Sequence, residues 1–341
     1  MIKTFAEISA KDFLELATDA GSVVFDVRSE GEFEQGHFPG AIHLPLLNNE
    51  QRKAVGICYK SQGQEAAIEL GFELVGPFFG EKIKSAKKLC KDKTIFIYCW
   101  RGGLRSNIMA WLLTTAGLKV TLIQGGYKAI RNTCIAAFQR KRNMFVVTGK
   151  TGVGKTDILR KIEHEHVHFL DLEHLALHRG SAFGGLGQPE QPSQEHFENK
   201  IALQLYYLPN EHSVLVEDES RMIGKVRIPD DLYSQMEEAP HIEIIANIDY
   251  RIQRILEEYG VFDDALLQEK TLLLQKRMGP EQCKKAMEYL KEGDKKAWCK
   301  LLLDYYDKSY NHKFAEHPRQ MKGTLDSQIP NIAEQLIALI S

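Results

Sequence analysis

Short apolar runs rich in β-branched residues alternate with helix-like segments along the first part of the chain. A helical pattern over 104–117 separates the last two of these runs and closes on a glycine. Strands that alternate with helices are typical of a parallel sheet with helices on its faces, so we predict an α/β domain. The strand-like runs lie at 22–28, 40–46, 94–99 and 120–126.

The alternation begins again after a basic run at 139–143. From residue 250 onward the apolar pattern becomes helical. We therefore predict two α/β domains, 1–138 and 139–341, the second ending in a helical region. Its strand-like runs lie at 144–149, 167–173, 213–220 and 242–249.

Composition narrows the class of protein but not its partner. With 43% hydrophobic and 26% charged residues, the chain is expected to fold rather than remain disordered. The N-terminal segment lacks an apolar signal core, and no stretch approaches the ~18 apolar residues of a membrane span, so we expect a cytoplasmic protein with no membrane partner. The net charge of -2 gives no global attraction to nucleic acid, although 81–93 and 140–142 are locally basic. The cysteines show no C-x-x-C spacing, which argues against a disulfide framework or a zinc site.

A phosphate-binding loop is predicted at 149–156, where "GKTGVGKT" fits the pattern G-x-x-x-x-G-K-[ST] between a strand and a helix. Backbone N–H groups of such a loop surround a phosphate, and Lys155 adds a positive charge. Thr156 can bind a magnesium ion. The predicted binding residues are Gly149, Lys150, Thr151, Gly152, Val153, Gly154, Lys155 and Thr156.

Acidic residues follow two later strands of the same domain. Glu217, Asp218 and Glu219 end the run "VLVEDES", and any of the three could serve a metal-bound water or only cap a turn. Asp171 ends "VHFLD" and faces the same two interpretations. The long polar loop after it contains His178 and Arg179, and it either closes over a substrate or is a solvent-exposed linker.

A second candidate site follows the run "TIFIYC". Cys99 ends this strand, and a helix is predicted to begin near Leu104, so the turn between them points N–H groups and helix-dipole charge at one spot. Arg101 and Arg105 would hold a tetrahedral anion there. Cys99 is therefore either a nucleophile in an anion-binding loop or a packed residue at a strand end. The spacing C-x5-R-S is shared by thiol phosphatases and rhodanese-type sulfurtransferases.

The segment "VVFDVRSEGEFEQGHFPGAIHLPL" at 23–46 distinguishes these two classes. It resembles the N-terminal signature of rhodaneses in its D-x-R-x-x-x-E-F-x-x-G-H-x-P-G-A frame, and Tyr98 stands where thiol phosphatases usually have histidine. From their positions we expect Asp26 and Arg28 to hold loops together rather than to take part in chemistry.

Taken together, the two halves resemble the tRNA 2-selenouridine synthases. The resemblance rests on "NNEQRKAVGICYKSQGQEAAIELG", "CWRGGLRS", "GGYKAIR", "GKTGVGKT", "DLEHLALHRGSAFG", "QPSQEHFEN", "VEDESRMIG" and "YYDKSY", which span most of the chain. It implies a rhodanese-like parallel-sheet domain followed by a P-loop NTPase-like α/β domain with a helical C-terminal part.

The resemblance also implies an activity. Such enzymes convert 2-thiouridine at the wobble position of tRNA to 2-selenouridine with selenophosphate, after S-geranylation by geranyl diphosphate. Cys99 matches the cysteine thought to carry selenium, with Arg101 and Arg105 as the anion clamp, and no tightly bound cofactor is expected. The P-loop would hold geranyl diphosphate or a nucleotide, with further binding residues at Asp171, His178, Arg179, Glu217, Asp218 and Arg221.

Two other functions stay open on the sequence. The C-x5-R spacing also fits a thiol phosphatase fused to a P-loop module. The P-loop also fits an RNA kinase or ATPase whose rhodanese domain is inert.

Overall fold

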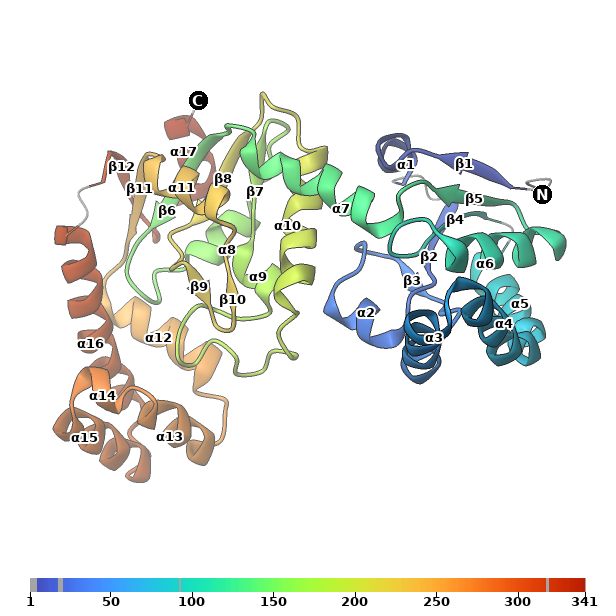
Figure 1. Ribbon diagram of the computed structural model, residues 1–341. Helices are drawn as coiled ribbons and strands as arrows, with labels where there is room; N and C mark the ends of the chain where they lie inside the picture. The colour runs from blue at the N-terminus through green and yellow to red at the C-terminus, as the bar shows by residue number, and fades with distance from the viewer. Residues whose placement is uncertain (1–4, 18–20, 92, 317–318, 341) are drawn as a thin grey trace. The chain divides into compact units, whose positions relative to one another are not determined.

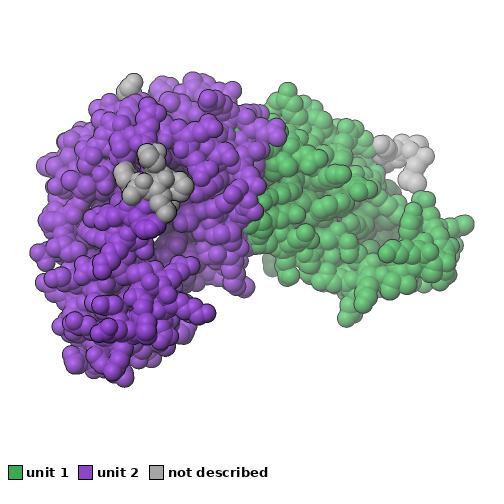
Figure 2. Space-filling model, turned by 60° about the vertical axis from the view of Figure 1, so that its left-hand side comes forward, with its two compact units in different colours: residues 1–137, 193–206 green, residues 138–192, 207–341 purple. Residues whose placement is uncertain are grey.

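The computed structural model describes residues 5–17, 21–91, 93–316 and 319–340 (Figure 1). The chain divides into two compact units, coloured separately in Figure 2. Unit 1 is Met1–Ala137 with Ser193–Tyr206, and unit 2 is Phe138–Pro192 with Tyr207–Ser341. The sequence indicated two contiguous segments instead, because nothing in it shows that the later helix belongs with the first unit.

Unit 1 is built on a parallel sheet with the strand order β1-β5-β4-β2-β3. The buried strand β4 lies between β2 and β5, so the loop that contains Cys99 leaves the middle of the sheet at its carboxyl edge. The predicted strand runs are confirmed with shorter bounds, and β1 is an edge strand that the pattern did not indicate. The strands are β1 Ala6–Ile8, β2 Ser22–Asp26, β3 Ile42–His43, β4 Thr94–Tyr98 and β5 Val120–Ile123.

Successive side chains of β4 point to opposite faces of the sheet, and helices cover both faces. Ile95 and Ile97 join a core formed with α4, α5 and α6, whereas the ring of Phe96 packs edge-on against Phe13 of α1. This is the period of two expected of a strand covered on both faces. The helices are α1 Ala10–Leu16, α2 Glu30–Gln35, α3 Asn49–Gln62, α4 Gln64–Val75, η1 Gly76–Phe78, α5 Phe79–Cys90, α6 Leu104–Thr115, α7 Gly126–Ile135, η2 Ala136–Gln139 and α10 Gln194–Tyr207.

Helix α10 is tied to α7 by polar contacts that involve buried groups. Asn199 donates to the Tyr127 hydroxyl at 2.7 Å, and that hydroxyl donates to Glu195 at 2.7 Å. Arg131 of α7 donates to Asn199 at 2.6 Å. These bonds explain why "QPSQEHFEN" and "GGYKAIR" carry matching polar residues although they lie far apart in the chain.

Unit 2 contains a second parallel sheet, with the strand order β12-β11-β6-β8-β7. Strand β6 precedes the P-loop and pairs with β8, so the loop and the acids after β8 share one carboxyl edge. Helices α8 and α17 cover one face through Ile158, Leu159 and Leu336. The strands are β6 Asn143–Thr148, β7 Val167–Phe169, β8 Ser213–Glu217, β11 His241–Ile245 and β12 Met321–Asp326, and a separate hairpin pairs β9 Met222–Ile223 with β10 Val226–Arg227.

The helical part of unit 2 has its own core around Trp298, Leu267 and Leu290. The prediction of a helical C-terminal part is confirmed, although strand β12 interrupts it. The sequence did not predict this strand, because a short run that contains Gly323 and exposed polar residues gives little strand signal. In the described part of the chain no helix is long and apolar enough to span a bilayer. The helices are α8 Lys155–Arg160, α9 Leu172–Ala176, α11 Asp230–Glu238, α12 Ile248–Tyr259, α13 Asp264–Leu272, α14 Gln275–Met278, α15 Pro280–Lys291, α16 Lys295–Glu316 and α17 Ile332–Ile340.

Candidate functional site

Cys99 lies at the start of the turn between β4 and α6. Its side chain is buried, and the Ser106 hydroxyl lies 3.1 Å from Cys99 Sγ and 3.0 Å from the Gly103 carbonyl oxygen. Ser106 stands in the first turn of α6, where the helix dipole favours negative charge. The turn therefore offers a thiolate both a hydrogen-bond donor and a helix N-terminus.

The segment "GGYK" packs directly under this turn. The backbone N–H of Tyr127 donates to the Cys99 carbonyl at 2.8 Å, and that of Lys128 donates to the Trp100 carbonyl at 3.0 Å. A Cβ at Gly126 would lie 2.2 Å from the Cys99 carbonyl oxygen, and its φ of +58° also favours glycine. Glycine at position 126 therefore lets the start of α7 pack directly against the backbone of the cysteine turn.

The two predicted clamp arginines have different surroundings. Arg105 donates to both carboxylate oxygens of Glu32, at 2.6 and 3.1 Å. Burial acts to raise the pKa of Glu32, but the hydrogen bonds and charge of Arg105 outweigh it and lower that pKa. Arg101 instead lines a pocket of about 470 Å³ together with Lys128 and Asn132. Arg101 and Lys128 are the two cations that line this pocket, and the sequence did not single out Lys128.

Asp26 and Arg28 have the scaffold role that the sequence predicted. Both are fully buried, and Arg28 donates to Asp26 and to the Gly36 carbonyl, each at 2.6 Å. The guanidinium lies 4.0 Å from the ring centre of Tyr127. It thereby joins the loop after α2 to the start of α7.

The P-loop of unit 2 connects β6 to α8, as predicted. Lys155 Nζ donates to the Gly149 carbonyl at 3.0 Å. A Cβ at Gly149 would lie 2.3 Å from the Ile244 carbonyl oxygen, so glycine is required where the loop leaves the sheet. Arg251 Nε donates to the Thr151 carbonyl at 2.8 Å and its guanidinium pairs with Asp307, which fixes the loop from α12 and α16.

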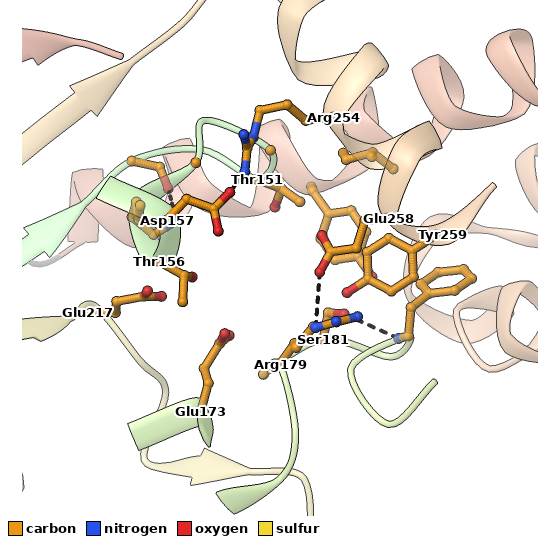
Figure 3. Close-up of a pocket in the computed structure, with 18 of the residues that line it drawn as sticks. Thr151, Thr156, Asp157, Glu173, Arg179, Ser181, Glu217, Arg254, Glu258 and Tyr259 are labelled. Atoms are coloured by element: carbon orange, nitrogen blue, oxygen red, sulfur yellow. Dashed lines mark hydrogen bonds and ion pairs between the residues drawn. The ribbon is translucent and has the colours of Figure 1, made fainter. Parts of the chain in front are cut away.

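A pocket of about 810 Å³ opens on this loop (Figure 3). The loop's contribution to its wall comes from glycines together with Thr151, Lys155 and Thr156. Of the other predicted loop residues, Val153 is buried in the core and Lys150 lies 3.7 Å from Asp307, so neither lines the pocket.

The acids after β8 point in different directions. Burial raises the pKa of Glu217 while the nearby Thr156 side chain acts to lower it, and Glu217 Oε1 is buried without a hydrogen-bond partner among the described residues. Asp218 accepts from Thr148 at 2.9 Å and from Arg319. Glu217 is thus the acid beside the P-loop threonine, whereas Asp218 is engaged by an arginine.

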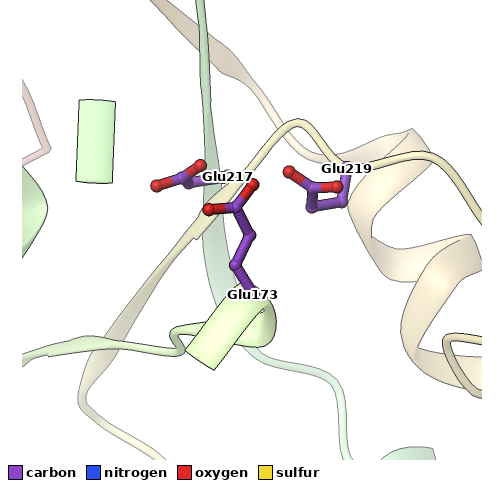
Figure 4. A group of neighbouring side chains, drawn as sticks. All are labelled: Glu173, Glu217 and Glu219. Atoms are coloured by element: carbon purple, nitrogen blue, oxygen red, sulfur yellow. The ribbon is translucent and has the colours of Figure 1, made fainter. Parts of the chain in front are cut away.

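Glu173, Glu217 and Glu219 form a compact acidic group, which we call the glutamate cluster (Figure 4). One carboxylate oxygen from each residue can be chosen so that the three lie within 4.8 Å of one another. Burial, followed by the neighbouring negative charges, raises the pKa of Glu173 and of Glu219. A divalent cation would suit these hard oxygen ligands, and Thr156 adds a hydroxyl next to Glu217. Sequence reasoning missed Glu173, which lies on α9 within "DLEHLALHRGSAFG", because the resemblance gave this position no role.

Of the four remaining predicted binding residues, two line the pocket and two do not. His178 and Arg179 line it, and Arg179 Nε lies 2.9 Å from Glu258. Asp171 is not among the lining residues, because it caps α9 through His174 N at 2.9 Å and pairs with Arg160. Arg221 is not among them either and pairs with Asp230.

Comparison with known proteins agrees with both halves of this description. A family model described as the tRNA 2-selenouridine synthase AAA domain matches residues 142–336, and one for the rhodanese-like domain matches residues 9–133. The resemblance predicted from the sequence is thereby confirmed at the level of each domain.

Curated relatives named tRNA 2-selenouridine synthase extend the match. That of Nitrosomonas europaea is 42% identical over 248 residues, which are 70% of this chain and 64% of the relative, just under two thirds of its length. That of Shewanella denitrificans is 40% identical over 74% of this chain and 69% of the relative. That of Cupriavidus pinatubonensis is 34% identical over 86% of this chain and 89% of the relative. The chain belongs to the tRNA 2-selenouridine synthase family.

Proposed function

We propose that this protein modifies tRNA, converting wobble-position 2-thiouridine to 2-selenouridine by way of an S-geranylated intermediate. The observation that carries the proposal is the presence, in one chain of this family, of a cysteine turn and of a phosphate-loop pocket. Each of the two steps then has a chemically suitable site.

The P-loop pocket suits the alkylation step. The thiouridine sulfur attacks C1 of geranyl diphosphate, and the new S–C bond forms as the C–O bond breaks with its electron pair leaving on diphosphate. The base loses its N3 proton to solvent in the same step. Lys155 and the loop N–H groups stabilise the negative charge that develops on that leaving group. In the S-alkylated product the sulfur is singly bonded to C2 and can depart as geranylthiol once protonated. The doubly bonded sulfur of a thiocarbonyl is a poor leaving group.

The selenium step is a substitution at C2 of the base. Selenophosphate, water and the geranylated base give the selenouridine, geranylthiol and phosphate, with no change in the oxidation state of selenium. We place this step at the cysteine turn, where Arg101 and Lys128 are available for the phosphate group.

Cys99 is the proposed covalent residue of the selenium step. Attack of its thiolate on phosphorus would form an S–P bond and release hydrogen selenide as the nucleophile, and water would then free phosphate. An S-selanyl Cys99 also requires a two-electron oxidant such as a disulfide, because forming an S–Se bond oxidises selenium. Mass spectrometry of the protein treated with selenophosphate distinguishes a phosphorylated from a selenated cysteine.

A magnesium ion is the metal most compatible with the P-loop. Thr156 and Glu217 are the residues that would hold it, with Glu173 and Glu219 close by. When bound, it would neutralise diphosphate charge.

The test is nucleoside analysis of thiolated tRNA incubated with the protein, selenophosphate and geranyl diphosphate. Geranylated uridine should form without selenophosphate, and selenouridine should form when both are present. The absence of both products would refute the proposal. Turnover of an aryl phosphate that is lost in Cys99→Ser would support a phosphatase instead, and ATP hydrolysis that is lost only in Lys155→Ala would support an RNA kinase or ATPase.

A further inference from the structure

The pocket on the P-loop has two chemically different ends. Its polar end contains Lys155, Arg160 and Arg254 beside the loop N–H groups. Its other end reaches into the core of the helical part of unit 2. Its apolar lining includes Phe183, Ile255, Tyr259, Trp298, Leu302 and Leu303.

Three aromatic rings form a continuous wall at the apolar end, which we call the aromatic wall. The ring of Phe183 packs edge-on against Tyr259, with centroids 6.0 Å apart, and against Trp298, with centroids 5.7 Å apart. Phe183 is therefore the middle member of the wall, and replacing it leaves Tyr259 and Trp298 on either side of the space.

The wall is held rigidly from behind. Trp298 is buried, and its Nε1 donates to Thr271 Oγ1 at 3.1 Å, while that hydroxyl donates to the Leu267 carbonyl at 2.7 Å. Because the Trp298 ring is fixed by a buried hydrogen bond, it cannot move aside without leaving polar groups unpaired.

Phe183 itself comes from the loop between α9 and α10, which is braced locally. Its N–H lies 3.2 Å from Ser181 Oγ, and its carbonyl accepts from Leu186 N–H at 2.9 Å. The loop also contributes His178 and Arg179 to the same pocket. A short turn thus places one aromatic ring at a set depth in the cavity.

We infer that Phe183, backed by Trp298, sets the length of the hydrocarbon chain that this pocket accepts. The inference rests on the proposed function, since it assigns the apolar end to the prenyl group and the P-loop end to the diphosphate. An anionic head and an apolar tail match the two ends of the cavity. If Phe183 sets this limit, a chain one isoprene unit longer than geranyl meets its ring.

Removing that ring should change which chain is used. Phe183→Ala should raise the ratio of kcat/KM for farnesyl over geranyl diphosphate by at least about tenfold, because each added methylene that fits an apolar pocket is favoured severalfold or more. The assay is S-alkylation of thiolated tRNA with the two diphosphates, separately and in competition. Phe183→Leu is the milder variant and should give a smaller change of the same sign.

Leu186→Ala is the matched control. Leu186 is 4% exposed and belongs to the same core as Phe183, yet it does not line the pocket. Its truncation should destabilise the same core. Because Leu186 does not line the pocket, the ratio of kcat/KM for farnesyl over geranyl diphosphate should equal that of the wild type.

The outcomes separate the two claims. If the wild type transfers geranyl but the ratio is unchanged in both Phe183 variants, the inference is wrong and the proposed function stands. If the wild type binds inorganic diphosphate but transfers neither prenyl group, the proposed function fails and the inference fails with it. A ratio that rises equally in Leu186→Ala also overturns the inference, since loosening of the core would then explain the change.

Discussion

The glutamate cluster makes the charge of the phosphate pocket depend on pH. Burial and the charges of Glu217 and Glu219 raise the pKa of Glu173 from 4.5 to about 9. Above its ordinary pKa the unfolded residue loses its proton while the folded one keeps it. The free energy of unfolding therefore falls as pH rises through this window, until the folded carboxyl also ionises.

Glu173→Gln should remove this penalty. We expect the variant to unfold at a higher temperature than the wild type, with a gain that grows from about pH 5 to about pH 9. The measurement is the thermal unfolding midpoint across pH in the presence of a chelator. The exposed Glu238→Gln serves as control and should show a difference that does not vary with pH. A gain of constant size in Glu173→Gln would contradict the explanation.

At the residue scale, the sequence identified the P-loop residues because the motif fixes their spacing. The sequence could not show which of Glu217, Asp218 and Glu219 lies beside the P-loop. The alternation of side chains at the end of a strand explains which of them do. Glu217 and Glu219 point to one side and join Glu173, whereas Asp218 points to the other and meets Arg319. The pairing of Arg105 with Glu32 also depends on distant chain segments, so it could not be predicted.

At the element scale, the P-loop depends on two helices from the far end of the chain. The buried Arg251 of α12 links the Thr151 carbonyl to Asp307 of α16, with guanidinium-to-carboxylate distances of 2.6 and 2.9 Å. The helical part of unit 2 thus acts as a brace for the phosphate site, a role that helical periodicity alone does not reveal.

Asp307→Ala should weaken this brace. A buried arginine without its partner is expected to lower the free energy of unfolding by roughly 3 kcal/mol and to weaken diphosphate binding. Urea unfolding followed by Trp298 fluorescence, with Trp100 and Trp111 replaced by phenylalanine, measures unit 2 specifically. Glu288→Ala removes an exposed pair with Lys284 at 3.9 Å and should cost less than about 0.5 kcal/mol. Equal losses in the two variants would show that the brace has no special role.

Element types were predictable where the apolar pattern was strong, and were not where pairing came from distant segments. Strands β4, β6 and β8 are buried apolar runs, and the pattern found each of them. Strand β12 is largely exposed and is held in place by pairing with β11, so its own residues say little. Helix α10 was expected in unit 2 because chain order was the only guide.

At the scale of the whole molecule, each unit contains one candidate site. The residues of the cysteine turn all belong to unit 1, and those of the phosphate pocket all belong to unit 2. A division of chemistry between units predicts that a substitution in one site leaves the reaction of the other intact. Such a division is also consistent with two separate family models matching the two halves.

Single substitutions in each unit should therefore separate the two reactions. Cys99→Ala should abolish selenation yet leave geranylation of thiolated tRNA at its wild-type rate. Lys155→Ala should reduce geranylation by at least about a hundredfold, because a developing diphosphate charge loses its lysine. It should still convert tRNA that was geranylated beforehand, a substrate that bypasses the first site. The exposed Lys161→Ala, at the end of the same helix, is the control for charge. Loss of both reactions in each variant would contradict this division and would indicate that the two steps share one site.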